Sequence, residues 1–436
     1  MKHLARLAPL GLCVLSLHTM GKSALPACPG KDSLLAIQLF QPTRITIPSA
    51  AFTQRQPGAS READNLQPVV IADSFSASSY PVEGARFLQF RIEKNFSMAI
   101  TKREDIRQVH QASPFTGIHG RIAWQLPANS IYASLYRKPV LGLGMMISTF
   151  SNPSVGNPVG VYGFLQVPLV ARPGRFQLLY EIALGVVGNL NPYDEVKNPE
   201  NLLVGSAVNA LVDLGLEGRY ILSKQWELGL GVGLKHISNG ATKRPNKGVN
   251  IIPVQLNVQY RLAEENSPGR LMHQYSFKPF VALEVSNMSG FKQMHPGDPM
   301  TFKNISSLQA AYQFSYKYRV GLGMDLTYSS GGTTRVADGG SAFSQQFSFG
   351  ISGTWSWFIT EKLYLPISVG LYTHRNPEND ETTPYYQRVG LRYLFPKRHL
   401  SAGIGLKFHA GVADFIEAGI GWTFHRDRNQ YRVEKD

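Results

Sequence analysis

Along most of the chain, apolar residues alternate with polar residues or glycine, and the alternation is clearest over 225–238, QWELGLGVGLKHIS. The even-numbered positions carry Trp226, Leu228, Leu230, Val232 and Leu234. The odd-numbered positions between them carry a glutamate, three glycines and a lysine. Because successive side chains of a β-strand point to opposite faces, this pattern predicts a strand with one apolar and one polar face. The preceding segment, VNALVDLGLEGRYIL, shows the same division.

Similar segments, separated by turn residues, continue from residue 85 to residue 424. Charged residues and glycines share one face, which is typical of an outer-membrane β-barrel whose apolar face meets lipid. Connections alternate between short ones, such as 222–225, and long ones, such as 189–207 and 286–302. Short periplasmic turns and long outer loops require this alternation. We therefore predict an all-β transmembrane antiparallel barrel of about sixteen strands, with both termini in the periplasm.

A weak internal repeat divides these strands into two halves. Three short motifs recur in the same order: LGLGM (141–145) as VGLGM (320–324), NPYDE (191–195) as NPEND (376–380), and GVGLK (231–235) as GIGLK (403–407). The repeat indicates a duplicated eight-strand unit, which closes either as one large barrel or as two small ones. We predict the two units at 84–263 and 274–424, followed by a C-terminal tail at 425–436.

The first 27 residues have the composition of a signal peptide. Lys2 and Arg6 form a basic start, an apolar stretch follows at 7–17, and small residues offer cleavage sites near residue 27. Cleavage there leaves Cys28 as the remaining cysteine, either unpaired or lipidated. Residues 28–83, rich in Pro, Ser, Gln and Ala, predict an extended or disordered arm.

The chain carries 44 basic and 30 acidic residues, which gives a formal net charge of +14. A basic surface suits both anionic lipids and nucleic acids. Because the chain is predicted to be exported, we expect a membrane lipid partner and no nucleic acid.

The stretch HISNGATKRPNK begins at the end of the predicted strand 225–238. Continued alternation places His236 and Ser238 on the lipid-facing side, and Asn250 in the next strand falls on the same face. Polar side chains facing lipid are costly, which favours a functional role. A serine two residues from a histidine on a strand lies within reach for activation as a nucleophile. In the intervening loop, Asn239 and Asn246 are candidate donors to an oxyanion.

These residues resemble the signature of the outer-membrane lipid A 3-O-deacylases of the PagL type, a His-x-Ser-Asn run followed by a loop asparagine. The resemblance is strong over 117–262 and also covers the longer relatives known as acyloxyacyl hydrolases. It implies a carboxylic ester hydrolase of the bacterial outer membrane that removes the 3-hydroxyacyl chain at position 3 of lipid A, within lipopolysaccharide. It also implies Ser238 as nucleophile, His236 as base, and no cofactor or metal.

The chain departs from this pattern at one position, because Asn250 replaces the glutamate that orients the histidine in the family. An amide can fix an imidazole tautomer but cannot stabilise an imidazolium by charge. The basic residues Lys243, Arg244 and Lys247 predict contacts with lipid A phosphates, or alternatively a solvated loop.

The rival hypothesis is a non-catalytic barrel that binds lipopolysaccharide or forms a porin-like channel. Bulky, mutually paired charges in the lumen would argue against a channel. His409 and Glu417, near the end of the second half, alternate with outward apolar residues and are predicted to face the lumen.

Overall fold

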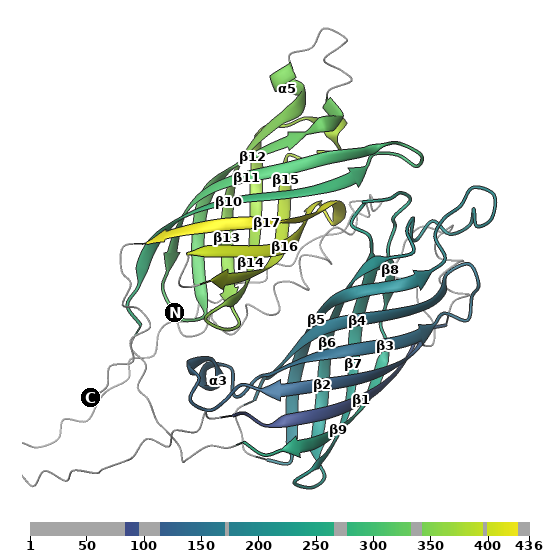
Figure 1. Ribbon diagram of the computed structural model, residues 1–436, viewed down its shortest axis with the longest axis vertical. Coiled ribbons are helices and arrows are strands. Elements are labelled where there is room, and N and C mark those ends of the chain that lie inside the picture. Colours follow the sequence, from purple (N-terminus) through teal and green to yellow (C-terminus); the bar gives the residue numbers. More distant parts are fainter. Residues whose placement is uncertain are drawn as a thin grey trace, which may run out of the picture. The chain divides into compact units, whose positions relative to one another are not determined.

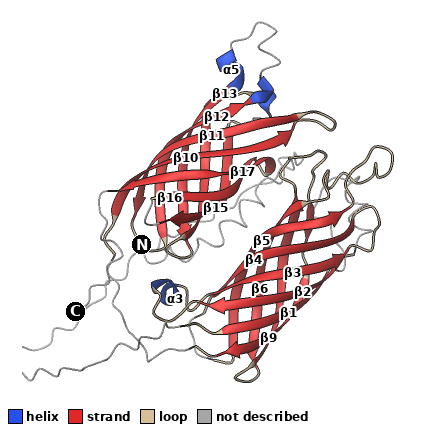
Figure 2. Cartoon of the chain, viewed as in Figure 1, coloured by secondary structure: helices blue, strands red, loops and turns tan. Residues whose placement is uncertain are grey.

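The computed structural model describes residues 83–95, 114–170, 174–265, 277–332, 342–395 and 399–425. All of them belong to one compact unit, residues 82–436. The predicted signal peptide (1–27), nearly all of the predicted arm (28–83) and nearly all of the predicted tail (425–436) lie outside the described residues. The described part is built almost wholly of antiparallel strands (Figure 1; Figure 2).

The first sheet closes on itself as a barrel. Its strands are β1 (Arg86–Lys94), β2 (Thr116–Gln125), β3 (Val140–Thr149), β4 (Gly156–Pro168), β5 (Phe176–Leu190), β6 (Asn209–Ile221), β7 (Trp226–Ser238), β8 (Val249–Ile251) and β9 (Val254–Ala263). From β1 to β7 each strand pairs with the next, β7 also pairs with β8 and β9, and β1 pairs with β9 to close the ring. Because β8 and β9 pair with successive parts of β7, they act as one strand, and the barrel has eight positions.

The second sheet is a closed eight-stranded barrel in which β10 pairs with β17. Its strands are β10 (Phe280–Gln293), β11 (Met300–Gln313), β12 (Tyr318–Ser329), β13 (Phe347–Phe358), β14 (Leu363–His374), β15 (Tyr385–Phe395), β16 (Leu400–His409) and β17 (Val412–His425). The predicted all-β barrel fold is thus confirmed, and the chain forms two barrels of eight instead of one barrel of sixteen.

The predicted long connection at 286–302 is wrong. Strand β10 continues to Gln293 and β11 begins at Met300, so that only 294–299 connect them. The cross-strand pair Phe291 and Phe302, with ring centroids 5.4 Å apart, stabilises this extension of the hairpin. Strand pairing between aromatic residues thus extends the hairpin through a segment that its polar residues suggested was a loop.

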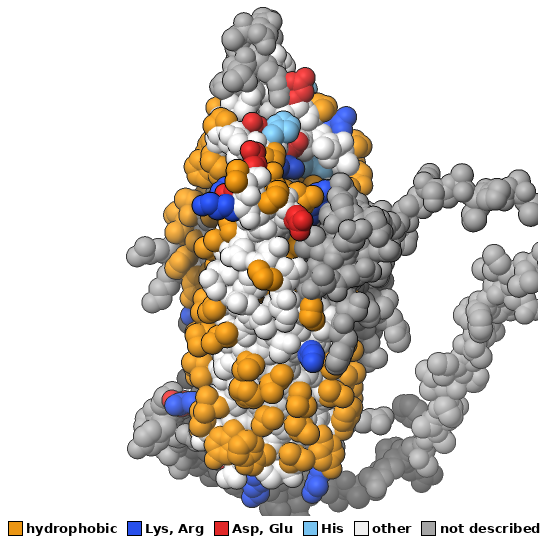
Figure 3. Space-filling model, turned by 90° about the vertical axis from the view of Figure 1, so that its right-hand side faces the viewer, with side chains coloured by type: hydrophobic (Ala, Val, Ile, Leu, Met, Phe, Trp, Pro, Cys, Tyr) orange, Lys and Arg blue, Asp and Glu red, His pale blue; other side chains and the backbone are white. Residues whose placement is uncertain are grey.

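The apolar side chains of both barrels face outwards. In β1, Leu88 and Phe90 are 45% and 46% exposed, whereas the alternating Gln89 and Arg91 are 5% and 1% exposed. Figure 3 shows hydrophobic side chains over much of one face of the molecule, with charged side chains gathered mainly towards its upper end. An apolar outside around a polar inside is the arrangement that a lipid bilayer requires. No helix in the described part of the chain is long and apolar enough to cross a membrane.

Paired charges lie across the lumen of the first barrel, beside buried apolar side chains such as Phe164. The guanidinium of Arg91 donates two hydrogen bonds of 2.9 Å to the carboxylate of Glu181, and Arg121 donates another of 2.7 Å. Nearer the end that carries the His236 segment, the ammonium of Lys235 lies 2.5 Å from the carboxylate of Glu93, with both side chains fully buried. These cross-barrel pairs fix the strands around a solid interior.

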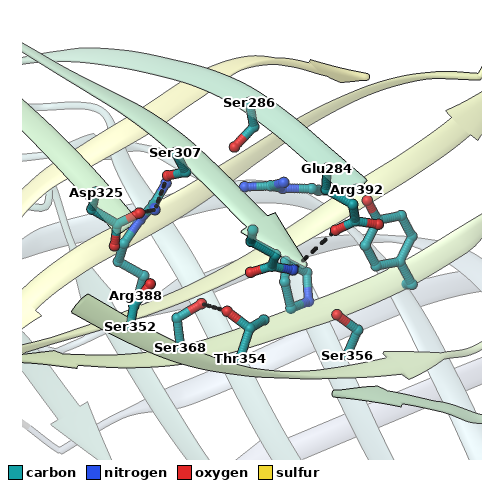
Figure 4. Close-up of a pocket in the computed structure, with 13 residues that line it drawn as sticks. Glu284, Ser286, Ser307, Asp325, Ser352, Thr354, Ser356, Ser368, Arg388 and Arg392 are labelled. Carbon is teal, nitrogen blue, oxygen red and sulfur yellow. Dashed lines mark hydrogen bonds and ion pairs between the residues drawn. The ribbon is translucent and has the colours of Figure 1, made fainter. Parts of the chain in front are cut away.

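The lumen of the second barrel combines paired charges with hydroxyl groups. Arg388 lies 3.1 Å from the carboxylate of Glu417, which faces the lumen as predicted. Figure 4 shows the small cavity beside this pair, where the hydroxyls of Thr354 and Ser368 are 2.8 Å apart. The cavity measures about 30 Å³, which is room for about two water molecules. His409, also predicted to face the lumen, is buried and hydrogen-bonded to the hydroxyl of Tyr372 at 2.9 Å.

Candidate active site

The end of β7 and the short strand β8 bring three polar side chains together on the outer face of the first barrel. In the strand register, His236 lies opposite Asn250, and Ser238 lies opposite Ala210 of β6. The face is the one that carries Leu230 and Val232 lower on β7, which are 63% and 45% exposed. Strand alternation therefore puts the three polar groups at the end of an apolar, lipid-facing stripe.

The three side chains form a continuous hydrogen-bonded series. The Nε2 atom of His236 lies 2.9 Å from the hydroxyl oxygen of Ser238, and its Nδ1 atom lies 2.7 Å from the amide oxygen of Asn250. An amide oxygen only accepts, so Nδ1 carries the proton of this bond. The Nε2 atom then holds the lone pair that faces the serine hydroxyl, as a general base requires.

Gly248 lets the backbone approach the imidazole ring closely. Its φ of +76° suits glycine, and a Cβ atom at this position would lie 2.7 Å from Cε1 of His236. Its N–H donates to the carbonyl of Leu203 at 2.8 Å. Sequence reasoning missed this residue, although a glycine directly before a strand is a signal for a positive φ or a close approach.

The loop after Ser238 is held by the side chain of Asn239. Its amide nitrogen donates to the hydroxyl of Ser206 at 3.0 Å and to the carbonyl of Lys243 at 2.8 Å. Its backbone N–H donates to the amide oxygen of Asn246 at 3.1 Å. Both N–H groups of the Asn239 side chain are therefore engaged within the protein, whereas the described bond of Asn246 uses its oxygen.

The long loop between β5 and β6 supports the site from one side. Ser206 receives the bond from Asn239, and the carbonyls of Leu202 and Leu203 accept the N–H groups of Lys247 and Gly248 at 3.3 Å and 2.8 Å. Leu203 is 1% exposed. These loop residues were not predicted, since no local pattern indicates which outer loop folds against another.

The three basic residues of the loop differ in their surroundings. Lys243 and Lys247 are exposed, whereas Arg244 is half-buried and its guanidinium lies 2.7 Å from a carboxylate oxygen of Asp380. Two of the three cations predicted to contact phosphate are thus free to do so, while the third already has an anionic partner. Within the described ranges, no group of three or more His, Cys, Asp and Glu side chains could hold a metal ion.

The comparison with protein families covers both barrels. Residues 118–261 match the lipid A 3-O-deacylases (PagL), and residues 274–426 match the C-terminal domain of acyloxyacyl hydrolases. The chain belongs to the PagL family. The segment with His236, Ser238 and Asn250 lies within the PagL match.

Comparison with the curated proteins gave no similar sequence. Among solved structures, the siderophore receptor PirA from Acinetobacter baumannii is similar at 10% identity and a TM-score of 0.21, over 75% of this chain and 53% of the receptor. This chain thus spans about half the length of that receptor. The outer membrane protein Omp33 from Acinetobacter baumannii is similar at 9% identity and a TM-score of 0.14, over 79% of this chain and 99% of Omp33.

Proposed function

We propose that this protein is a serine esterase that removes an ester-linked acyl chain from lipid A in the outer leaflet. The observation that supports this most is the series Ser238–His236–Asn250 on the outer face of the barrel, with bonds of 2.9 Å and 2.7 Å. Because the series faces sideways, a lipid substrate reaches it by diffusion within the leaflet. Lipopolysaccharide, not a soluble ester, is therefore the substrate class.

In the first half of the reaction, the Ser238 oxygen attacks the ester carbonyl carbon while its proton passes to Nε2 of His236. The carbonyl oxygen becomes an oxyanion. The bond between the acyl carbon and the sugar oxygen then breaks, and His236 returns the proton to that oxygen. In the second half, water attacks the acyl-serine with His236 again as base, and the fatty acid leaves as the serine regains its proton.

Asn250 orients His236 throughout these steps. Its oxygen accepts the Nδ1–H bond and holds the ring with Nε2 towards Ser238. Both imidazole nitrogens contact neutral groups, so the imidazolium formed during catalysis gains no ion-pair stabilisation from a carboxylate. We therefore propose an active but slow site, in comparison with one that carries a glutamate at this position.

The two loop asparagines, Asn239 and Asn246, differ in their ability to donate hydrogen bonds to the oxyanion. Both N–H groups of the Asn239 side chain donate within the loop, so its contribution is to shape the loop. We assign the amide N–H groups of Asn246 as side-chain donors to the oxyanion, since its described bond uses only the oxygen. Lys243 and Lys247, both exposed beside the site, bind the lipid A phosphates.

A channel function is disfavoured by the interiors of both barrels. Arg91, Arg121 and Glu181 cross the first lumen, and Arg388, paired with Asp325 and Glu417, lies across the second. The alternative that stays open is a barrel that binds lipopolysaccharide without cutting it.

The test is mass spectrometry of lipid A from cells that express the wild-type protein, Ser238→Ala or Asn250→Glu. We expect wild type and Asn250→Glu to release one hydroxyacyl chain and Ser238→Ala to release none. Cleavage by Asn250→Glu alone would show a silenced enzyme. If folded, membrane-inserted forms of all three leave lipid A intact, the binding function replaces the esterase.

A further inference from the structure

The loop that follows Ser238 makes polar contacts with the second barrel. The backbone N–H of Arg244 donates to the side-chain oxygen of Gln293 at 2.8 Å, and its Nε donates to the Gln293 carbonyl at 3.1 Å. The Gln293 N–H in turn donates to the carbonyl of Ala241 at 3.0 Å. Gln293 ends β10 and is only 7% exposed, so these bonds lie in a protected contact.

An ion pair extends this contact into the second lumen. Asp380, at the outer end of the second barrel, binds Arg244 at 2.7 Å and the buried ammonium of Lys292 at 3.0 Å. Lys292 also lies 2.6 Å from the fully buried carboxylate of Asp414, which binds Lys407. Arg244 is therefore attached to a rigid charged cluster and not to a single exposed carboxylate.

An apolar contact lies closer still to the nucleophile. A Cβ atom on Gly240, whose φ is +60°, would lie 2.3 Å from Cγ1 of Ile416 and 3.4 Å from Cδ1 of Leu406. Leu406 and Ile416 are cross-strand partners on β16 and β17. They are half-buried, whereas Ile404 and Ile420 on the same outward face are each 56% exposed. The loop therefore covers this part of the second barrel.

We propose that the second barrel is a positioning domain for the active site on the first. Through Gln293, Asp380 and the Leu406–Ile416 pair, it holds 239–244, and the bond from the Asn239 N–H to the Asn246 oxygen keeps the amide donors of Asn246 beside Ser238. Because Gly240 lies two residues from Ser238, at most about 7 Å along the chain, Ile416 also forms an apolar wall beside the acyl chain. The catalytic part of this inference rests on the proposed esterase function; the attachment of the loop does not.

A second contact between the barrels, at the opposite end of the strands, supplies a matched control. Tyr136, directly after the helix α3 (Ile131–Leu135), accepts a hydrogen bond of 2.6 Å from the indole N–H of Trp357. The nearby Tyr132 donates to the carbonyl of Tyr316 at 3.0 Å. Trp357→Phe removes one bond between the barrels without touching the catalytic loop.

The experiment compares the full-length wild type with Asp380→Ala, Asp380→Glu and Trp357→Phe in detergent micelles. The first measurement is the rate of trypsin cleavage after Lys243 and Lys247. This rate depends on how firmly the loop is held, and it does not depend on esterase activity. We expect Asp380→Ala to speed this cleavage at least fivefold, Asp380→Glu to restore most of the protection, and Trp357→Phe to match the wild type.

The second measurement is deacylation of purified lipid A by the same variants, each made with Asn250 and with Asn250→Glu. We expect Asp380→Ala to lower kcat about tenfold with KM unchanged, since a misplaced loop affects the transition state more than binding. The proposal would be overturned if Asp380→Ala kept both the trypsin protection and the kcat of the wild type. It would also be overturned if Trp357→Phe lost as much protection and kcat as Asp380→Ala. Faster trypsin cleavage without deacylation in any background would support the attachment of the loop to the second barrel and overturn the esterase function.

Discussion

Asn250 lies directly opposite His236 in the strand register, with its amide oxygen 2.7 Å from Nδ1 of the imidazole. An orienting acid would stand at this position, and the neutral amide keeps the geometry without the charge. Asn250→Glu should therefore raise kcat, by up to about 10⁴-fold, because a carboxylate stabilises the imidazolium. Initial rates on lipid A micelles measure this. A rate equal to or below that of the wild type, in a folded variant, would contradict the role given to Asn250.

Ser238 and His236 act as one unit, so that removing either side chain should lower kcat by about as much as removing both. We expect Ser238→Ala, His236→Ala and the double variant to show the same residual rate. The measurement is release of hydroxy fatty acid by each purified variant. Additive losses would indicate two independent roles and would argue against a serine activated by this histidine.

Gly248→Ala should displace the imidazole ring, since the added Cβ would lie 2.7 Å from Cε1 of His236 at a φ of +76°. We expect a loss of about 1 kcal/mol or more in the free energy of unfolding, together with a large fall in kcat. Gly120→Ala is a matched control, because a Cβ there meets no atom within 4 Å. Two measurements on each variant test this: the thermal unfolding midpoint, monitored by the change in gel mobility on unfolding, and kcat. Loss of stability and of kcat should appear in Gly248→Ala and not in Gly120→Ala; equal values for the two variants would contradict the close approach at Gly248.

Asn246→Asp separates the two functions of this side chain. It keeps an oxygen that accepts the Asn239 N–H but removes the amide donors. We expect a fall in kcat of about 10²–10³-fold, the range for a lost oxyanion donor, with trypsin protection of the loop unchanged. If kcat stays at the wild-type level, the oxyanion is bound by other groups.

The double variant Lys243→Gln, Lys247→Gln tests the phosphate contacts. Because both side chains are exposed, their attraction to a phosphate is screened by salt. The variant should raise KM for lipid A several-fold at low salt, leave kcat unchanged and reduce the salt dependence of KM. A lipid A that lacks its phosphates should abolish the difference between the variant and the wild type. The same KM for both proteins at every salt concentration would exclude these contacts.

The sequence by itself determined which face of each strand meets lipid, because strand alternation is a local property of the backbone. It therefore placed His236, Ser238 and Asn250 on one outward face, and His409 and Glu417 in the lumen, as the structure shows. It also determined that charged side chains would lie on the face of each strand that points into the lumen.

Only the tertiary structure decided how many barrels form, because closure depends on which distant strands pair. The pairing of β1 with β9 and of β10 with β17 joins segments more than a hundred residues apart, and alternation is the same for one ring or two. The same reason applies to Ser206 beneath Asn239 and to Ile416 against Gly240. These contacts join loops and strands that no local pattern relates, so the surroundings of the site emerged only from the packing of the chain.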